Sequence, residues 1–555
     1  MVSIHEDKGK CASYISLKTN YRVGKKVKSK YIYLGASEIA VRILHDMQSK
    51  PLIDENEISY SGETILTKLA NSVGFESVIT KYTKDKRISR VLKNIVVLRL
   101  LFPESKRKLV KVRLKNSILK DSTNLKYLGE VYKFMDAIYD HLGDVLYELA
   151  KNAIRKYSLD LKYLIIDATR LKVYKNKDTD LIKPGYSGKE RRDLRQANLI
   201  MGVNGQQIPF FVEIYPGNTV DSDMFGPFIK HIRCRYRLIT KKSQKTIIII
   251  DQGNVNEKNI KCLHGIKKSD IYFAAMVPTQ MMGRFIEKVD KSKMKVVYTK
   301  KEPNGEETNT CGTLIQDEEL HGVSSNVLVC YNPDIAKHKC KKLNKNVGAV
   351  KERAKSVNES KNMSLDDKYA DVASLIKNYC LKRAIEPIKD EKQGILTLEI
   401  DDDELKARRK RYGFFGIFTD DKDLSAKELI RVYKTRDLIE KGFEVLKSEL
   451  EICPVNHSRD DRIENHAVLV IYGYFLLSLL KAILSAKGIE YSFGELKEII
   501  KSRHAMEGFF EHELLENKRL YIMRPINPGK KLEKIFKTLR IKTPKYEVKE
   551  CIPTG

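Results

Sequence analysis

Two short, continuous apolar runs stand out in the pattern of hydrophobic and polar positions along the chain. Residues 163–166 and 246–250 consist almost entirely of aliphatic and β-branched residues. Continuous apolar runs of this length predict strands that are buried on both faces. Each run is followed directly by an aspartate, Asp167 after the first and Asp251 after the second. Because the chemistry of open α/β sheets lies beyond the carboxyl ends of the strands, these carboxylates mark one edge of a predicted sheet.

Other segments show strand or helix periodicity. Strands are predicted at 161–166, 197–203, 208–215 and 271–277. Asn204-Gly205, between the second and third of these, is a strong hairpin-turn signal. Residues 13–35 also predict a β-hairpin, residues 37–150 carry mostly helical patterns, and a Lys-rich helix is expected at 334–357.

A further helical pattern spans residues 424–452 and carries polar residues of several kinds. Ser425 and Glu428 stand in capping-box spacing at its start. At 100° per residue, four side chains share an arc of about 60°. These are Tyr433, Arg436, Glu440 and Lys447. Such a stripe suits a metal ion beside a phosphate, and an ordinary solvated face with an ion pair between Arg436 and Glu440 explains it as well.

The strand-end aspartates favour the first explanation. Asp167, Asp251 and Glu440 together offer the oxygen ligands that hard divalent cations require. Two such cations can activate a water or a 3′-hydroxyl and stabilise the leaving oxygen of a phosphodiester. The aspartates of 401–403 and 420–423 are expected to be solvated runs or helix caps rather than metal ligands.

The order Asp167, Asp251, Glu440, with the glutamate inside Tyr-x2-Arg-x3-Glu-x6-Lys, resembles the DDE transposases of bacterial and archaeal insertion sequences. Within them it resembles the branch with the Tyr-Arg-Glu-Lys signature. The resemblance covers roughly residues 90–500. It implies an RNase H-like catalytic domain in which the three carboxylates are catalytic and hold two Mg²⁺ ions, with Mn²⁺ able to substitute. It also implies that Tyr433, Arg436 and Lys447 hold DNA phosphates.

The same resemblance suggests further DNA contacts. Lys189 and Arg191 lie in a Ser/Lys/Arg/Asp segment like that of the family, although Gly188 stands where a lysine is usual. Arg462 is expected near the edge of the active site, and His466 is expected to be a core histidine. Relatives stack a Trp from the insertion on a flipped base, and this chain has no Trp. Any substitute would be a Tyr, Phe or Met. Met281, Met282 and Phe285 are candidates, although a packed strand end explains them better.

The predicted fold class is α/β, an RNase H-like catalytic domain with a β-rich insertion between the second Asp and the Glu, plus helical N-terminal and C-terminal modules. The expected domains are an N-terminal module at 1–155, the first part of the catalytic domain at 156–280, an insertion at 281–410, the second part at 411–485, and a C-terminal helical module at 486–555. The N-terminal module would recognise the ends of the element.

Composition adds a strongly basic balance. Lys and Arg number 103 against 73 Asp and Glu, a net charge of +30. Such a charge favours a polyanionic partner, although an AT-biased genome that inflates Lys explains it equally. Nine scattered Cys without a C-x-x-C pair indicate reduced thiols in a cytoplasmic protein. The apolar run at 467–480 is too short to span a bilayer, so we expect a buried core helix and no membrane partner.

The expected partners are double-stranded DNA, both terminal inverted repeats and target DNA, and a second copy of the chain in a synaptic complex. Two other functions remain open from the sequence. One is a metal-dependent nuclease that cuts without joining strands, and the other is an inactive DNA-binding derivative of a transposase.

Overall fold

The computed structural model describes most of the chain, in segments separated by short gaps. These are residues 2–8, 13–23, 26–175, 177–185, 195–236, 245–265, 270–301, 306–360, 362–501, 504–515, 519–525, 529–542 and 547–550. The chain forms two compact units. Unit 1 contains Met1–Asp160, Ala168–Thr219 and Leu438–Gly555, and unit 2 contains Leu161–Asp167 and Val220–Asp437.

A large mixed sheet organises unit 2. Its strand order is β11-β12-β13-β16-β10-β9-β5, in which β5, β9 and β10 are parallel and the strands from β16 onward are antiparallel. The bounds are β5 (Tyr163–Lys172), β9 (Thr246–Ile250), β10 (Ile271–Met276), β11 (Lys295–Lys301), β12 (Glu307–Leu320), β13 (Val323–Tyr331) and β16 (Phe414–Thr419). Every residue of β9 is buried, as its continuous apolar sequence predicts.

Four helices of unit 2 alternate with the strands of this sheet along the chain. They are α9 (Asp221–Tyr236), α10 (Glu257–His264), α11 (Met282–Ile286) and α15 (Ala426–Lys434). Helix α15 packs on β9, β10 and β16 through Leu429, Ile430 and Val432, which are buried. Its predicted capping box is present, because Ser425 and Glu428 each accept a backbone hydrogen bond from the other.

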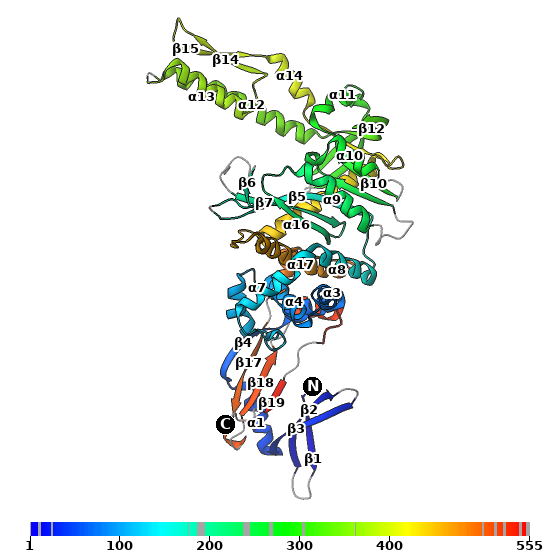
Figure 1. Ribbon diagram of the computed structural model, residues 1–555, viewed down its shortest axis with the longest axis vertical. Coiled ribbons are helices and arrows are strands. Elements are labelled where there is room, and N and C mark those ends of the chain that lie inside the picture. The colour runs from blue at the N-terminus through cyan, green and yellow to red at the C-terminus, as the bar shows by residue number, and fades with distance from the viewer. Residues whose placement is uncertain are drawn as a thin grey trace. The chain divides into compact units, whose positions relative to one another are not determined.

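The predicted insertion divides into two parts. Strands β11 to β13 extend the main sheet, whereas the rest forms a separate layer of α12 (Pro333–Glu359), α13 (Leu365–Asn378), β14 (Ile385–Asp390), β15 (Ile395–Ile400) and α14 (Asp402–Arg411) (Figure 1). This layer has its own core, which includes Val350, Val357, Val372 and Leu396. The expected Lys-rich helix is confirmed as α12. Besides the strands of the expected β-rich insertion, α12 and α13 pack on the β14–β15 hairpin.

The core of unit 1 is a helical bundle around α17 (Asp460–Ser485). Helices α2 (Ser61–Ser72), α4 (Lys86–Leu101), α7 (Leu128–Ile138), α8 (Leu142–Tyr157) and α18 (Phe493–Lys501) contact it, and α3 (Phe75–Thr83) packs on α4. By length and composition α17 could cross a membrane, but 89% of its most apolar window is buried inside the structure. The prediction of a buried core helix is therefore confirmed.

Strands of unit 1 lie beside this bundle. Strands β7 (Arg195–Asn204) and β8 (Pro209–Pro216) form the hairpin predicted from Asn204-Gly205, and β6 (Lys183–Pro184) pairs with β7. Helices α8 and α17 cover β8. The side-chain carbonyl of Asn204 accepts hydrogen bonds from the backbone of Gln206 and Ile208, which closes the turn.

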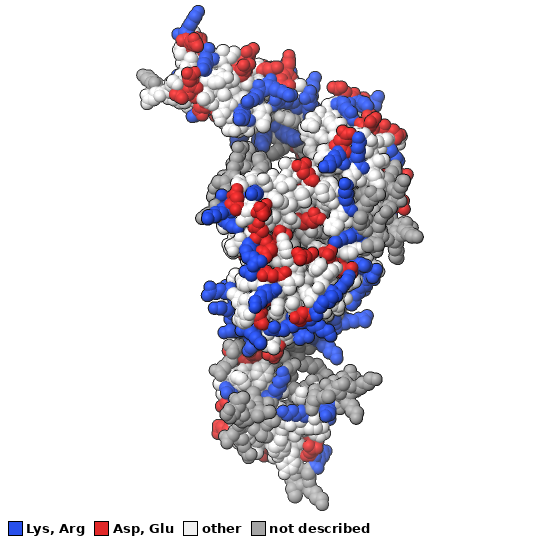
Figure 2. Space-filling model, viewed as in Figure 1, with Lys and Arg blue, Asp and Glu red and all other residues white. Residues whose placement is uncertain are grey.

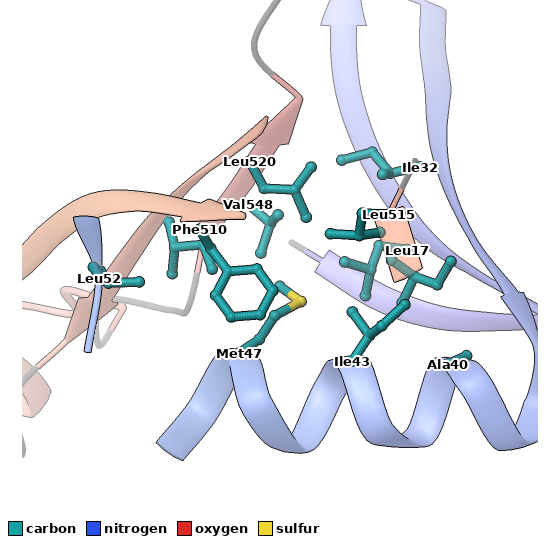
Figure 3. Packing of buried hydrophobic residues seen from close by; sticks show 12 residues of the cluster. Leu17, Ile32, Ala40, Ile43, Met47, Leu52, Phe510, Leu515, Leu520 and Val548 are labelled. Carbon is teal, nitrogen blue, oxygen red and sulfur yellow. The ribbon is translucent and has the colours of Figure 1, made fainter. Parts of the chain in front are cut away.

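The two ends of the chain meet in unit 1. Strands β1 (Val2–Lys8), β2 (Ser13–Val23) and β3 (Lys26–Ala36) form one sheet, followed by α1 (Ser37–Ser49). Strand β4 (Ile53–Ser59) pairs with β17 (His504–Glu511), which is followed in the sheet by β18 (Arg519–Pro525) and β19 (Glu547–Glu550). Figure 3 shows the shared core, where Ile43 and Met47 of α1 face Phe510, Leu520 and Val548.

The hairpin predicted at 13–35 is thus confirmed. The described residues of the expected helical C-terminal module include α18 and α19 (Gly529–Thr538), but also β17, β18 and β19. The strands were missed because β17 finds its partner β4 near the other end of the chain, and short-range periodicity carries no trace of such a pairing.

Candidate active site

The two predicted aspartates follow neighbouring parallel strands at equivalent positions. Strands β5 and β9 are parallel, and Ile166 pairs with Ile250, so Asp167 and Asp251 are the next residues of both strands. Asp251 keeps an extended backbone (φ −78°, ψ 160°) before the short helix at 252–254. Because paired positions of adjacent strands share a face and lie about 4.8 Å apart, the register brings the two carboxylates side by side. Both belong to unit 2.

A cation already neutralises one of these carboxylates. The Arg436 guanidinium forms an ion pair with Oδ1 of Asp251, with side-chain exposures of 20% and 37% respectively. Its centre lies 5.9 Å from the ring of Tyr433, which is 7% exposed. The negative charge of Asp251 is therefore balanced by an arginine, at a residue that the sequence predicts to be a metal ligand.

The signature segment is not one helix, which corrects the sequence prediction. Helix α15 ends at Lys434, and α16 (Asp437–Ser448) begins after a turn at Thr435 and Arg436. The Thr435 hydroxyl donates to the carbonyl of Val432 at 2.6 Å, a local bond that competes with helix continuation. The shared arc of the four signature side chains therefore does not hold. It holds only for Glu440 and Lys447, which lie seven residues apart on α16.

Helix α16 is fastened within unit 1. The Gln207 amide donates to the carbonyl of Leu438 at 2.9 Å, which ties the start of the helix to the β7–β8 turn. Lys447 Nζ donates to Oγ1 of Thr169 at 2.6 Å, and Thr169 lies two residues after Asp167 along β5. Glu440 is exposed on this helix. The four signature residues thus divide, Tyr433 and Arg436 in unit 2 and Glu440 and Lys447 in unit 1.

The donor chemistry fits hard divalent cations. Carboxylate oxygens of Asp167 and Asp251 are the ligands that Mg²⁺ and Mn²⁺ prefer. Within the described residues, no group of three or more His, Cys, Asp or Glu side chains is arranged to hold a metal. Unit 2 therefore supplies a pair of carboxylates at one sheet edge, one of them held by Arg436.

Comparison with known proteins identifies the family. Residues 159–476, more than half of the chain, match the transposase DDE domain. The chain belongs to the DDE transposases. A solved piggyBac transposase, in a synaptic complex with hairpin DNA, is similar over 80% of each chain, with 10% sequence identity and a TM-score of 0.40. No curated protein matches the sequence.

Of the other residues predicted to contact DNA, the structure describes only Arg462. Lys189 and Arg191 lie outside the described residues. Arg462, near the start of α17, pairs with Asp136 of α7 at 3.2 Å and lies 4.9 Å from the ring of Tyr132. Its guanidinium therefore links two helices of unit 1. His466 is 8% exposed, which confirms a core position.

Two more predictions from the sequence can be compared with the structure. Met282 and Phe285 of α11 are 6% and 0% exposed, so neither can stack on a base without rearrangement. Asp401 caps α14, accepting from the backbone of Asp403 and Glu404, as expected.

The aspartates after β16 differ from the expectation. Asp420 and Asp421 are both fully buried rather than solvated. Asp420 accepts from His264 at 3.0 Å and from the Phe273 amide at 3.0 Å, while Asp421 pairs with Lys245 at 2.7 Å. These are buried carboxylates with structural partners in the transposase, and no local sequence signal distinguishes them from a solvated run.

Proposed function

We propose that this transposase cleaves the ends of an insertion sequence and joins its 3′ ends to target DNA, and that it belongs to the branch with the Tyr-Arg-Glu-Lys signature. The observation that carries the proposal is the register of β5 and β9, which places Asp167 beside Asp251 inside a DDE domain. Parallel β5, β9 and β10, with chemistry at the ends of the first two, are what an RNase H-like catalytic core requires.

Asp167, Asp251 and Glu440 are the proposed catalytic residues and ligands of two Mg²⁺ ions, with Mn²⁺ as a substitute. When bound, such ions supply activation of the attacking hydroxyl and stabilisation of the leaving oxygen of the phosphodiester. Arg436 has two successive partners in this scheme. It holds Asp251 in the protein alone, and it would be available to a DNA phosphate if that carboxylate held a metal ion. Tyr433 and Lys447 position further backbone phosphates, a role that needs donors but no base recognition.

The insertion supports binding of the element's end. Helix α12 carries exposed lysines at 337, 339, 341, 342, 345, 351 and 355. Arg409 of α14 donates to Asn344 at 3.1 Å, so the basic end of α14 lies beside the middle of α12. Figure 2 shows Lys and Arg gathered where these helices lie. A continuous basic surface of this kind neutralises phosphates and releases counterions.

The proposal extends to the assembly and the compartment. Two ends of an element must be held together before both are joined to a target, so the active form on DNA is a homodimer in a synaptic complex. The protein would act in the prokaryotic cytoplasm, on the nucleoid. A nuclease that cuts without joining is the second candidate function, since the same carboxylates serve hydrolysis alone.

The test is a cleavage and joining assay. Purified protein, Mg²⁺ or Mn²⁺ and a labelled duplex with the gene's flanking inverted repeat are incubated beside Glu440→Gln and a metal-free reaction. Glu444→Gln is the matched control, since Glu444 is also exposed and lies one turn further along α16. Metal-dependent nicking at the repeat boundary with joined products, lost only in Glu440→Gln, supports the transposase. Nicking without joining supports the nuclease, and binding without cleavage in any metal overturns both.

A further inference from the structure

Unit 1 contains a cavity of about 410 Å³ that includes none of the proposed catalytic residues. It lies between the end of α4, the segment after it, the loop before α17 and the first turns of α17. Its polar lining is dominated by basic side chains, namely Arg99, Lys106, Arg107, His457 and His466. All of the elements around it belong to the same unit.

Three of these basic side chains are more than nine-tenths buried. Arg99 is 5% exposed, Lys106 4% and His466 8%. They cluster with His457, because Lys106 Nζ contacts Nδ1 of His466 and lies 3.3 Å from Nε2 of His457. Arg99 Nη2 donates to the carbonyl of Glu451 at 2.8 Å. Its Nε and Nη1 are buried and have no hydrogen-bond partner within the described residues.

The acidic side chains of the lining do not balance this charge. Glu104 is held by Arg113 at 2.6 Å and by Lys108 at 2.9 Å, neither of which lines the cavity. Glu451 is exposed and meets Arg99 through its backbone carbonyl. Among the described residues, neither Arg99 nor Lys106 has a carboxylate within ion-pair distance. Within the described residues, Glu451 and Glu104 therefore act on Arg99 only at longer range, and neither Arg99 nor Lys106 has a direct ion pair.

Such an arrangement is costly in a protein without a ligand. Removing an unpaired cation from water costs several kcal/mol, and the group responds by losing its proton more easily. Burial lowers the pKa of Arg99 to about 10 and that of His457 to about 4. Burial, and after it the charge of Arg99, holds the pKa of Lys106 well below its ordinary range. An anion in the cavity would supply the missing charge.

We propose that this cavity binds a phosphate group. Arg99 and Lys106 bring a guanidinium and an amine to the lining beside two imidazoles, and these basic groups together attract a phosphate anion. The volume holds a phosphate with part of what it is attached to. The phosphate comes either from a nucleic-acid backbone or from a free phosphate in solution. The inference does not rest on the proposed function, since cleavage plays no part in it.

The first test is thermal unfolding of the full-length protein in potassium phosphate and in potassium chloride of equal ionic strength. A ligand that binds only the folded state raises the melting temperature in proportion to the logarithm of its concentration. We expect a rise of about 2–4 °C in 10 mM phosphate. Lys106→Met abolishes that rise without lowering the melting temperature in chloride, because Met replaces a buried cation that lacks a partner. Lys111→Met, an exposed lysine five residues away, keeps it.

A second variant covers the case in which Lys106→Met does not fold. Asn456 is an exposed lining residue, and Asn456→Asp adds a negative charge of nearly the same shape. It should weaken phosphate binding at least threefold while leaving the fold intact. An unchanged phosphate response in Asn456→Asp and Lys106→Met overturns the proposal, and so does a native protein that responds equally to phosphate and chloride.

DNA binding then identifies the source of the phosphate. The affinity for a short duplex of arbitrary sequence is measured between about 50 and 200 mM salt. If the cavity takes a backbone phosphate, Lys106→Met lowers the slope of log affinity against log salt by about one relative to Lys111→Met. If the slopes agree while the phosphate response is lost, the ligand is a free phosphate.

Discussion

The strand-end aspartates of unit 2 and the basic cavity of unit 1 are both concentrations of charge, but they are neutralised differently. Asp251 is paired with Arg436 at a partly exposed edge, where the arginine can leave. Arg99 and Lys106 are more than nine-tenths buried, and the described residues offer them no carboxylate partner. A charge with an exchangeable partner suits a site that must open for a metal and a substrate. A charge buried without a partner suits a site completed by its ligand.

The largest effect expected at the aspartate edge comes from removing a carboxylate. Asp167→Asn and Asp251→Asn should each lower metal-dependent cleavage by roughly 1,000-fold, because a lost metal ligand removes several kcal/mol of transition-state stabilisation. Single-turnover cleavage of the labelled repeat measures it. Asp223→Asn, an exposed aspartate on α9, is the control and should cleave normally. Cleavage above about a tenth of the native rate in either variant would remove that aspartate from the mechanism.

A smaller effect is expected when Arg436, the partner of Asp251, is replaced and the carboxylate itself is kept. Arg436→Gln frees Asp251, so the Mn²⁺ concentration for half-maximal binding should fall by roughly tenfold, while cleavage falls because a phosphate contact is lost. Titration of Mn²⁺ by electron paramagnetic resonance measures the first change without activity. Arg431→Gln, an exposed arginine on α15, should bind Mn²⁺ like the native protein. Weaker Mn²⁺ binding in Arg436→Gln would mean that the arginine orders the site rather than competing for it.

Lysines of α12 should contribute less individually. Lys341→Ala and Lys345→Ala should each weaken duplex binding a few-fold and equally for all sequences, since phosphate contacts do not read bases. The salt slope should fall by about one for each lysine that touches a phosphate. Lys392→Ala, in the loop between β14 and β15 away from α14, serves for comparison. A loss confined to the inverted repeat would show that α12 reads sequence.

A separate effect, on stability rather than on DNA or metal binding, concerns a buried acid in unit 1. Burial raises the pKa of Glu63 to about 8, despite hydrogen bonds from Ser117 and the Ile118 amide. The folded state therefore binds the proton more tightly than the unfolded state. Stability from this group is complete below about pH 4.5 and is lost as the pH rises through about 8. Glu63→Gln should be more stable than the native protein at pH 8.5, by about 2 kcal/mol, and equally stable near pH 4.5.

Chemical denaturation at the two pH values measures this difference. Glu130→Gln should show the opposite sign, because the Lys126 amide and then Arg87 lower the pKa of Glu130. If Glu63→Gln has the same pH dependence as the native protein, Glu63 does not take up a proton on folding.

Sequence reasoning reached the parts of the site that local patterns encode. The apolar runs before Asp167 and Asp251 predict both the strands and the edge where the carboxylates stand. The break at Thr435 and Arg436 was missed, although a β-branched hydroxyl residue followed by Asp437, a residue typical of helix starts, was a readable signal. Without that break, the signature seemed to form one stripe on one helix.

The rest depends on residues far apart in the chain. The cavity combines Arg99 and Lys106 with His457 and His466, some 350 residues later, and each of them alone looks like an ordinary surface or core residue. Likewise, no residue near Asp420 in the sequence indicates that its carboxylate is buried and accepts hydrogen bonds from His264 and a strand amide. Patterns within one helix or strand can be predicted from the sequence, whereas the contact partners of a side chain depend on tertiary packing.

The pairing of β4 with β17 has a consequence for synthesis. Ser59 pairs with His504, and the ribosome must add 445 further residues after the first before the second exists. At about 5–20 residues per second, β4 waits roughly 20 to 90 seconds for its neighbour. The sequence of β4, IDENEIS, has three acidic residues among seven, and charge of this density discourages a lone strand from pairing with another nascent chain. A copy of the chain that terminates before β17 therefore leaves β4 without this partner.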